Sequence, residues 1–546
     1  MQRSLRKQKN LIFLLFLVVL CGLIMLPRLM SSDFGLLDDG VTLSIGREIQ
    51  DGTWEVSWEQ QTGRFRPVYW LINGLIYSLV GQNPLGFFLV NTLVLALIAI
   101  SIVLWVHAVT GNFLLSGLAA VFFITAGPTI EPFYTNSKAE PFQVLLILLC
   151  TLFFLAERNA NRKVHQALFA AACGFFMLLA MLIKETSIAI LPVYFGWWLL
   201  HRCFKLLDQS TNARWNLAPI VVVALAVLGF FYIRGLSVSV SMQDGGYSGR
   251  YLLSGERIIS SLIRWAGWIV RDFPFVFPLV AGYFVVSIET RTWKWMGLLL
   301  EAGIWAAGWV LVFLPWGYTA EYYLLPATVG IAIISAIGLE RIIHPRPQRS
   351  LLVKGIIAVC LLFSFAFWGI VQLRNISNGQ IQIAVDRANT ALLDYLAEEA
   401  PADASLAVNL PYQSEYRYEI ELYLTQLMDR PDLVFNDMLF TSDGGRLEED
   451  VVLGVTARVE NTVRQGPRIG ALTSEADFST WLQAFQASGS EAELLYETRE
   501  AVHLFNLDLF QLGCLLFPDK AFCATETPLL DRRVFHYGWD VYRLTP

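Results

Sequence analysis

The chain has 546 residues and a formal net charge of −6, and 55% of its residues are hydrophobic whereas only 16% are charged. With a mean hydropathy of +0.51 the chain is too apolar for a soluble globular protein, and its composition excludes that class. We therefore expect a polytopic membrane protein whose fold is mostly α-helical.

The first apolar stretch, residues 11–30, follows a cluster of basic residues, Arg3, Arg6, Lys7 and Lys9. A basic segment before an apolar one resembles a signal peptide, but about 20 apolar residues are enough to cross a bilayer. We interpret this stretch as a retained first membrane span with a cytoplasmic amino terminus.

Residues 31–83 form the first predicted outer loop. Apolar residues recur at every fourth position in segment 36–50, with polar residues on the other faces. The apolar segment 68–80 would span only about 20 Å as a helix, which is too short for a bilayer core of about 30 Å. We predict that both segments are interfacial helices on the outer surface.

The later apolar segments are expected to be helices because irregular backbone cannot face lipid. Eleven spans in total place the carboxyl terminus outside. The basic residues support this sidedness under the positive-inside rule, since clusters such as Arg158, Arg162 and Lys163 fall in predicted inner loops. The predicted spans are 11–30, 84–107, 112–128, 140–156, 166–183, 187–201, 216–234, 273–288, 295–314, 322–340 and 351–371.

From about residue 375 charged residues become frequent and apolar runs shorten. We divide the chain into a membrane domain, 1–373, and an exterior α/β domain, 374–546, of a plasma (inner) membrane protein. Cys514 and Cys523 lie in this exterior part, where oxidising conditions would allow them to pair. The strands are expected near 405–410, 432–435, 468–472, 493–507 and 534–544, with a helix over 415–428.

Two adjacent carboxylates, Asp38 and Asp39, follow the first span. Soluble donors such as nucleotide sugars and ATP are absent from the outer face, so chemistry there points to a lipid-linked substrate. Either carboxylate is a candidate general base for an acceptor hydroxyl, or a ligand of a divalent metal ion held against a phosphate. The alternative is that they cap the interfacial helix, where an acid gains about 0.3–1 kcal/mol.

Further charges lie at the outer ends of later spans. Glu131 and Glu140 flank the second outer loop, and an acid at the start of a span is costly unless it has a partner or a water-filled cavity. Lys184 and Glu185 lie at a tight turn between two spans. Either they neutralise each other, or the lysine offsets the charge that a phosphate leaving group develops.

Arginines and tyrosines complete the candidate set. Arg64 and Arg66 precede the second interfacial helix, and Arg234 ends the seventh span. A guanidinium group binds phosphate through two parallel hydrogen bonds, although such arginines also contact anionic head groups. Tyr322 and Tyr323 belong to an interfacial aromatic belt or stack on a sugar ring.

These motifs together resemble the GT-C glycosyltransferases: the paired acids, the Gly-Arg-Phe-Arg-Pro element at 63–67, the acidic second loop, the Lys-Glu-Thr turn and the Tyr-Tyr-Leu-Leu-Pro motif. Residues 1–345 are similar to the protein O-mannosyltransferase and aminoarabinose transferase group. The sequence departs from the mannosyltransferases in having Asp-Asp where they carry Asp-Glu.

The resemblance implies an enzyme that transfers a sugar from a polyprenyl-phosphate donor to an outer-face acceptor, with inversion. It implies that Asp38 or Asp39 is the base and that Glu140 assists or orients the acceptor. The phosphate would be held by Lys184, Arg64, Arg66 and Arg234, and the sugar or acceptor would contact Glu131, Glu185, Tyr322 and Tyr323.

No cofactor is expected, because a basic pocket stabilises a phosphate leaving group without a bound metal, although a divalent metal at Asp38 and Asp39 is the alternative. The expected partners are the donor, membrane lipids and an acceptor that is a glycan, a lipid or a protein, with no nucleic acid. The exterior domain carries none of the charge clusters assigned to chemistry, so we expect it to select the acceptor while the membrane domain holds the donor and activates the nucleophile.

Two other functions are compatible with a polytopic membrane protein. A transporter or flippase of lipids or glycolipids predicts charges in the middle of spans, broken helices and inverted repeats, whereas the charges here gather at outer ends. A non-catalytic membrane assembly protein, whose exterior domain binds a partner, would be favoured if the acids prove dispensable.

Overall fold

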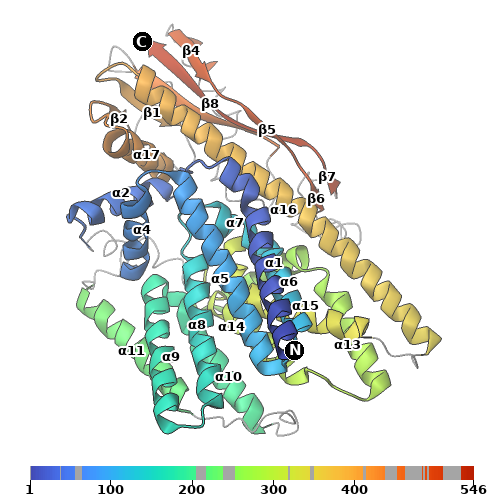
Figure 1. Ribbon diagram of the computed structural model, residues 1–546. Coiled ribbons are helices and arrows are strands. Elements are labelled where there is room, and N and C mark those ends of the chain that lie inside the picture. The colour runs from blue at the N-terminus through green and yellow to red at the C-terminus, as the bar shows by residue number, and fades with distance from the viewer. Residues whose placement is uncertain are drawn as a thin grey trace.

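The structure, a computed structural model, describes residues 2–36, 38–55, 64–203, 217–237, 252–317, 320–344, 350–409, 413–436, 452–461, 482–483, 486–487, 491–507 and 530–545. A bundle of helices forms its larger part, and a mixed β-sheet stands at one end of that bundle (Figure 1). The strand predicted at 468–472 and the residues Cys514 and Cys523 lie outside the described residues.

Among the described residues, seven helices are long and apolar enough to cross a membrane, or up to nine if each of two bent pairs is one span. The bent pairs are α6 (Phe113–Ile124) with α7 (Gly127–Tyr134), at 59°, and α12 (Gly255–Asp272) with α13 (Val276–Thr290), at 81°. The expected eleven spans would also need α10 (Ile190–Cys203) and α14 (Met296–Val312), which have only 14 and 17 residues. The long helices are α1 (Gln2–Met30), α5 (Pro84–Thr110), α8 (Glu140–Asn159), α9 (Lys163–Ile183), α11 (Ala218–Ser237), α15 (Leu325–Ile343) and α16 (Leu351–Glu399).

The ends of the helices follow from local sequence. In α5, Pro84 occupies the first turn, where its missing N–H costs nothing, and the Asn83 side chain accepts a hydrogen bond of 3.0 Å from the N–H of Leu85. Gly111 ends the same helix at a φ of 62°, a left-handed conformation that glycine adopts without strain.

The two helices predicted in the first outer loop are α2 (Asp39–Asp51) and α4 (Pro67–Val80), which pack against each other through glycines. A Cβ atom at Gly46 of α2 would lie 2.8 Å from the Cβ of Tyr77, and one at Gly74 of α4 would lie 2.6 Å from Cγ2 of Ile49. This close approach lets α4 hold α2 in place beside the bundle.

The sheet contains parallel and antiparallel pairs. Strands β2 (Val434–Asn436) and β3 (Val452–Glu460) flank β1 (Ser405–Asn409) in parallel, and β8 (Val534–Thr545) pairs antiparallel with β3, β4 (Glu491–Glu497) and β5 (Glu500–His503). Helix α17 (Gln413–Leu422) continues as the single π-helical turn Tyr423–Leu427 and connects β1 with β2. The short strands β6 (Asn506–Leu507) and β7 (Leu530–Asp531) form a separate pair. A mostly helical membrane protein with a C-terminal mixed sheet is thus confirmed.

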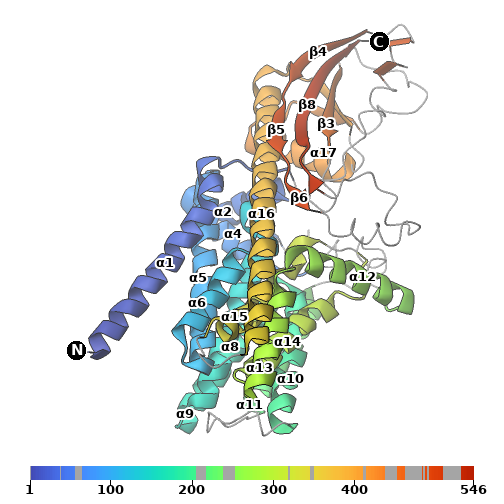
Figure 2. The ribbon, with the colours of Figure 1, turned by 90° about the vertical axis from the view of Figure 1, so that its right-hand side faces the viewer.

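Helix α16 joins the two parts and runs without a break for 49 residues from the bundle to the sheet (Figure 2). The domain boundary expected at 373/374 falls inside this helix. Under the sheet, the Asn389 side-chain oxygen accepts hydrogen bonds from Tyr537 at 2.8 Å and Trp539 at 2.9 Å. The sheet is therefore fixed to a helix that also packs in the bundle.

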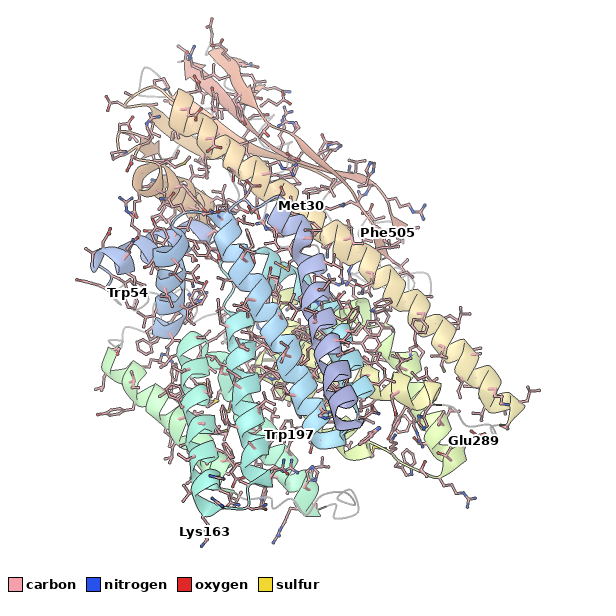
Figure 3. All side chains as sticks on the ribbon, in the orientation of Figure 1. Met30, Trp54, Lys163, Trp197, Glu289 and Phe505 are labelled. Carbon is pink, nitrogen blue, oxygen red and sulfur yellow. The ribbon has the colours of Figure 1, made fainter. Side chains whose placement is uncertain are left out.

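The basic loops and the sheet lie at opposite ends of the molecule. Lys163 lies at the end of the bundle farthest from the sheet, whereas Met30 and Trp54 lie toward the sheet (Figure 3). This is the arrangement that the positive-inside rule requires if the sheet is exterior.

We expect cysteine labelling to report this sidedness. In a background with the seven natural cysteines replaced, Glu491→Cys in exposed β4 should react with a membrane-impermeant maleimide in intact cells or spheroplasts. Lys163→Cys should react only after permeabilisation. The opposite pattern would reverse the orientation and remove the argument for a lipid-linked donor.

Candidate functional site

Asp38 and Asp39 stand at the start of α2 but have different environments. Asp38 is exposed, has a φ of 65°, and its side chain makes no capping hydrogen bond. Its carbonyl oxygen instead accepts a hydrogen bond of 2.8 Å from Thr42 Oγ1. Asp39 is buried, with an exposed fraction of 2%. The two acids therefore lie in different surroundings, Asp38 exposed before the helix and Asp39 buried in its first turn.

The Asp39 carboxylate faces a small cavity. Its Oδ2 accepts a hydrogen bond of 2.9 Å from the N–H of Gly35, whereas its Oδ1 has no hydrogen-bond partner among the described residues. Burial raises the pKa of Asp39 to about 6, although the Gly35 N–H and the charge of Lys138 oppose the rise. The cavity is lined by Gly35, Leu36, Asp39, Glu131, Thr135, Lys138, Gln382, Val385, Asp386, Asn389 and Tyr416.

Helix α16 contributes a second buried carboxylate, Asp386, to this cavity. Arg28, the last basic residue of α1, donates a hydrogen bond of 2.5 Å to Asp386 Oδ2, and Gln382 donates one of 3.0 Å to Oδ1. A Cβ atom at Gly35 would lie 2.8 Å from Asp386 Oδ1 and 3.5 Å from Asp39 Oδ2. Both carboxylates thus lie close to the position that a Cβ at Gly35 would take, and a glycine leaves room for them.

Helix α17 of the sheet region also holds the loop before α2. Glu419 accepts a hydrogen bond of 2.8 Å from the N–H of Gly40, and the hydroxyl of Tyr423, just beyond α17, donates one of 3.1 Å to the carbonyl of Gly35. Burial, together with the charges of Asp38 and Asp39, raises the pKa of Glu419 well above its usual range. Helix α17 thus contributes a buried acid next to the segment that carries Asp38 and Asp39.

These contributions from α16 and α17 were not expected from the sequence. Asp386 and Glu419 lie more than 340 positions beyond Asp39, and nothing in the local pattern of either indicates its partner. Helical periodicity is the signal in the sequence that could have revealed the continuation of α16. Beyond residue 373, the apolar residues Ile381, Val385 and Ala388 recur at the spacing of a buried helix face.

Lys184 and Glu140 form an ion pair between the end of α9 and the start of α8. The Lys184 ammonium lies 4.7 Å from the ring centre of Tyr323 and 5.7 Å from that of Tyr322. Both tyrosines belong to the short helix Glu321–Leu324. The predicted partner of Lys184 was Glu185, so the ion pair with Glu140 corrects the structural alternative.

Arg64 and Arg66 lie at the same end of the bundle as Lys184. Burial and the charge of Arg66 lower the pKa of Arg64, whereas the charges of Asp38 and Glu185 act in the opposite sense. The Arg66 guanidinium lies 5.3 Å from the ring centre of Tyr69 and 5.2 Å from that of Trp70. The structure thus brings the predicted cations Lys184, Arg64 and Arg66 to one end of the bundle with Glu185.

Arg234 lies one turn after Phe230 in α11, and the ring of Phe230 is 6.2 Å from that of Phe65. This places α11 beside the Arg64–Arg66 segment, whereas Arg234 is not among the residues that line the Asp39 cavity. Glu131, by contrast, lines the Asp39 cavity and also an adjoining one with Tyr134 and Glu321.

A buried network of four charges supports the tyrosines. Arg271 contacts Asp272 and Glu321, each at 2.7 Å, and Arg374 contacts Asp272 at 2.5 Å. Gly127 packs against this charge network, since a Cβ atom at Gly127 would lie 2.9 Å from Arg374 Nη2. The network joins α12, α16 and the short helix that carries Tyr322, so α16 borders both sides of the site.

Within the described residues, no group of three or more histidine, cysteine, aspartate or glutamate side chains is arranged to hold a metal ion. The charges that gather here are instead ammonium and guanidinium groups facing carboxylates and aromatic rings. Such an arrangement can accept a proton at a buried carboxylate and stabilise an anionic oxygen nearby.

No protein-family model and no curated protein matches the sequence. Among solved structures, the archaeal oligosaccharyltransferase AglB from Archaeoglobus fulgidus, in complex with an inhibitory peptide and a dolichol-phosphate, has a TM-score of 0.50 and 10% identity, covering 82% of this chain and 69% of that chain. ArnT from Cupriavidus metallidurans bound to undecaprenyl phosphate has a TM-score of 0.49 and 14% identity, covering 81% of this chain and 92% of that chain.

At these identities the comparisons show the fold alone. The similarity to AglB confirms the expected resemblance to the GT-C membrane glycosyltransferases at the level of the fold. The roles of individual side chains rest on the geometry described above.

The Lys184–Glu140 pair allows a direct test of stability. Its side chains are 16% and 3% exposed, so Glu140→Gln would leave a nearly buried ammonium without its partner. We expect a loss of about 3 kcal/mol in the free energy of unfolding. The exposed pair Arg47–Asp51, 3.9 Å apart, provides the control, because Asp51→Asn should cost less than about 1 kcal/mol. Equal thermal midpoints of the two purified variants would show that the Lys184–Glu140 pair stabilises the protein no more than the exposed pair does.

Proposed function

We propose that this protein transfers a sugar from a polyprenyl-phosphate donor to an acceptor on the outer face of the membrane, as an inverting glycosyltransferase. The observation that carries the proposal is the buried Asp39 carboxylate in a cavity that Lys138 also lines, while both Lys138 and Lys184 approach the ring of Tyr322. The fold similarity to AglB, which was solved with a dolichol-phosphate, supports this substrate class.

In the proposed reaction Asp39 is the general base. Its Oδ1, which has no hydrogen-bond partner among the described residues, takes the proton from an acceptor hydroxyl. The acceptor oxygen then forms a bond to the anomeric carbon of the sugar while the bond from that carbon to the phosphate oxygen breaks. The electron pair stays with the phosphate, so polyprenyl phosphate leaves, and attack from the opposite face inverts the anomeric centre.

The leaving phosphate gains negative charge and needs stabilisation more than it needs a proton. Lys184, Arg64 and Arg66 supply that charge in this proposal, so no cofactor is required. Glu140 holds the Lys184 ammonium through their ion pair instead of contacting the acceptor. Tyr322 and Tyr323 offer ring faces next to the same ammonium, on which a sugar could pack.

The sheet region contributes to acceptor activation as well as to acceptor choice in this proposal. Glu419 and Tyr423 hold the backbone of Gly40 and Gly35, and those residues flank the base. In this proposal the chain has eleven spans, a cytoplasmic amino terminus and the sheet outside, so this end of the bundle lies at the outer membrane surface, where a lipid-linked donor is available.

Substitution of the two aspartates should have unequal effects. Asp39→Asn removes the base, and we expect transfer to fall by about 10²–10⁴-fold, because that is the usual contribution of such a group. Asp38→Asn should change the rate only a few-fold, since Asp38 is exposed and asparagine tolerates its positive φ. The measurement is release of polyprenyl phosphate from a panel of polyprenyl-phosphate sugars by purified, monodisperse protein. Parental rates in Asp39→Asn would remove the assignment of the base.

The pH dependence follows from the raised pKa of Asp39, about 6. A base must be ionised, so kcat/KM should be constant above this value and fall tenfold for each further unit of acidity below it. The profile should be recorded between about pH 4.5 and 8, with folding checked at each pH. A rate that stays constant down to about pH 4.5 would show that Asp39 does not titrate in the reaction.

A further inference from the structure

Lys138 is a buried cation without an anionic partner in direct contact. It lies between α7 and α8 with an exposed fraction of 7%, and none of the described carboxylates forms an ion pair with it. Its ammonium lies 4.8 Å from the ring centre of Tyr322. A buried charge is costly unless something compensates it, and a ring face does so only in part.

The position of Lys138 connects the two sides of the site. It lines the cavity that contains Asp39, and it also faces Tyr322, the ring that Lys184 approaches. Both lysines therefore approach the ring of Tyr322, and Lys138 is the one that also lines the cavity of the proposed base. A phosphate seated against Tyr322 and next to Lys138 would place its sugar toward Asp39.

The charge of Lys184 is already compensated. Glu140 forms an ion pair with it, so Lys184 stabilises a phosphate less than a lysine with no such partner would. Lys138 has no such neutralising contact, and an oxygen of a phosphate would be the anion that its ammonium lacks. Charge-assisted hydrogen bonds of this kind are among the stronger ones in proteins.

We propose that Lys138 is a catalytic residue that binds the donor phosphate and stabilises it as the sugar–phosphate bond breaks. This assignment rests on the proposed function and identifies which cation the leaving group contacts. Lys184, Arg64 and Arg66 then supply the remaining positive charge, and Lys138 contributes more of it than the paired Lys184 does.

The other role open to Lys138 is to balance the charge of Asp39 without touching the substrate. The two roles differ in what Lys138→Met changes. If Lys138 binds the phosphate, Lys138→Met lowers the affinity for a phosphorylated lipid but not for the corresponding alcohol. If Lys138 only balances the charge of Asp39, Lys138→Met leaves both affinities unchanged. It then moves the acid limb of the pH profile to higher pH, because the charge that lowers the pKa of Asp39 is lost.

The experiment compares binding of undecaprenyl phosphate and of undecaprenol to the full-length protein in lipid nanodiscs. We expect Lys138→Met to weaken binding of the phosphate by about 10- to 100-fold and to leave binding of the alcohol unchanged. Lys138→Arg should restore much of the phosphate affinity, because it keeps the charge. Lys163→Met, an exposed lysine at the opposite end of the bundle, is the control and should match the parent. If Lys138→Met is not monodisperse, Lys138→Gln replaces it.

The outcomes separate this assignment from the proposed function. A parent protein that binds both lipids equally would contradict the donor class and the assignment with it. A parent that prefers the phosphate, with the same preference in Lys138→Met, would overturn the assignment alone. An upward shift of the pH profile with unchanged phosphate affinity would give Lys138 the charge-balancing role instead.

Discussion

The buried ion pair between Arg28 and Asp386 is the interaction on which the site depends. It joins the carboxyl-terminal end of α1 to the last third of α16, and both side chains are almost fully buried, at 0% and 2% exposed. Burying two charges is costly unless each has further hydrogen bonds, which Asp33, Ser31 and Gln382 provide. Because Asp386 lies against Gly35, this pair also determines where the Gly35 N–H holds the Asp39 carboxylate.

Helix α16 extends that constraint across the whole site. It carries Asp386 beside the proposed base and Arg374 in the charge network under Tyr322, and its far end lies beneath the sheet (Figure 2). A displacement of the sheet region would therefore be transmitted to both the base and the tyrosines. The membrane part and the sheet part thus both contact the segment that carries Asp39.

Much of the bundle and one side of the site could be predicted from sequence, because apolar length identifies helices and short loops return charges to the same end. This reasoning located Lys184, Glu140, Tyr322 and Asp39. It missed Asp386 and Glu419, since contacts separated by more than 340 residues leave no local pattern. The continuation of α16 past residue 373 was missed because its buried side chains there include the polar residues Asn378 and Asn389, so hydropathy falls while the helix continues.

The central claim is that the end of the bundle bearing Asp39 binds the phosphate of a lipid-linked donor. An experimental structure of the protein with undecaprenyl phosphate tests it most directly. The account predicts density for the phosphate beside the rings of Tyr322 and Tyr323, within hydrogen-bond distance of Lys138 or Lys184, with the prenyl chain leading out toward lipid. Phosphate density at the opposite end, near Lys163, or none at saturating ligand, would contradict it.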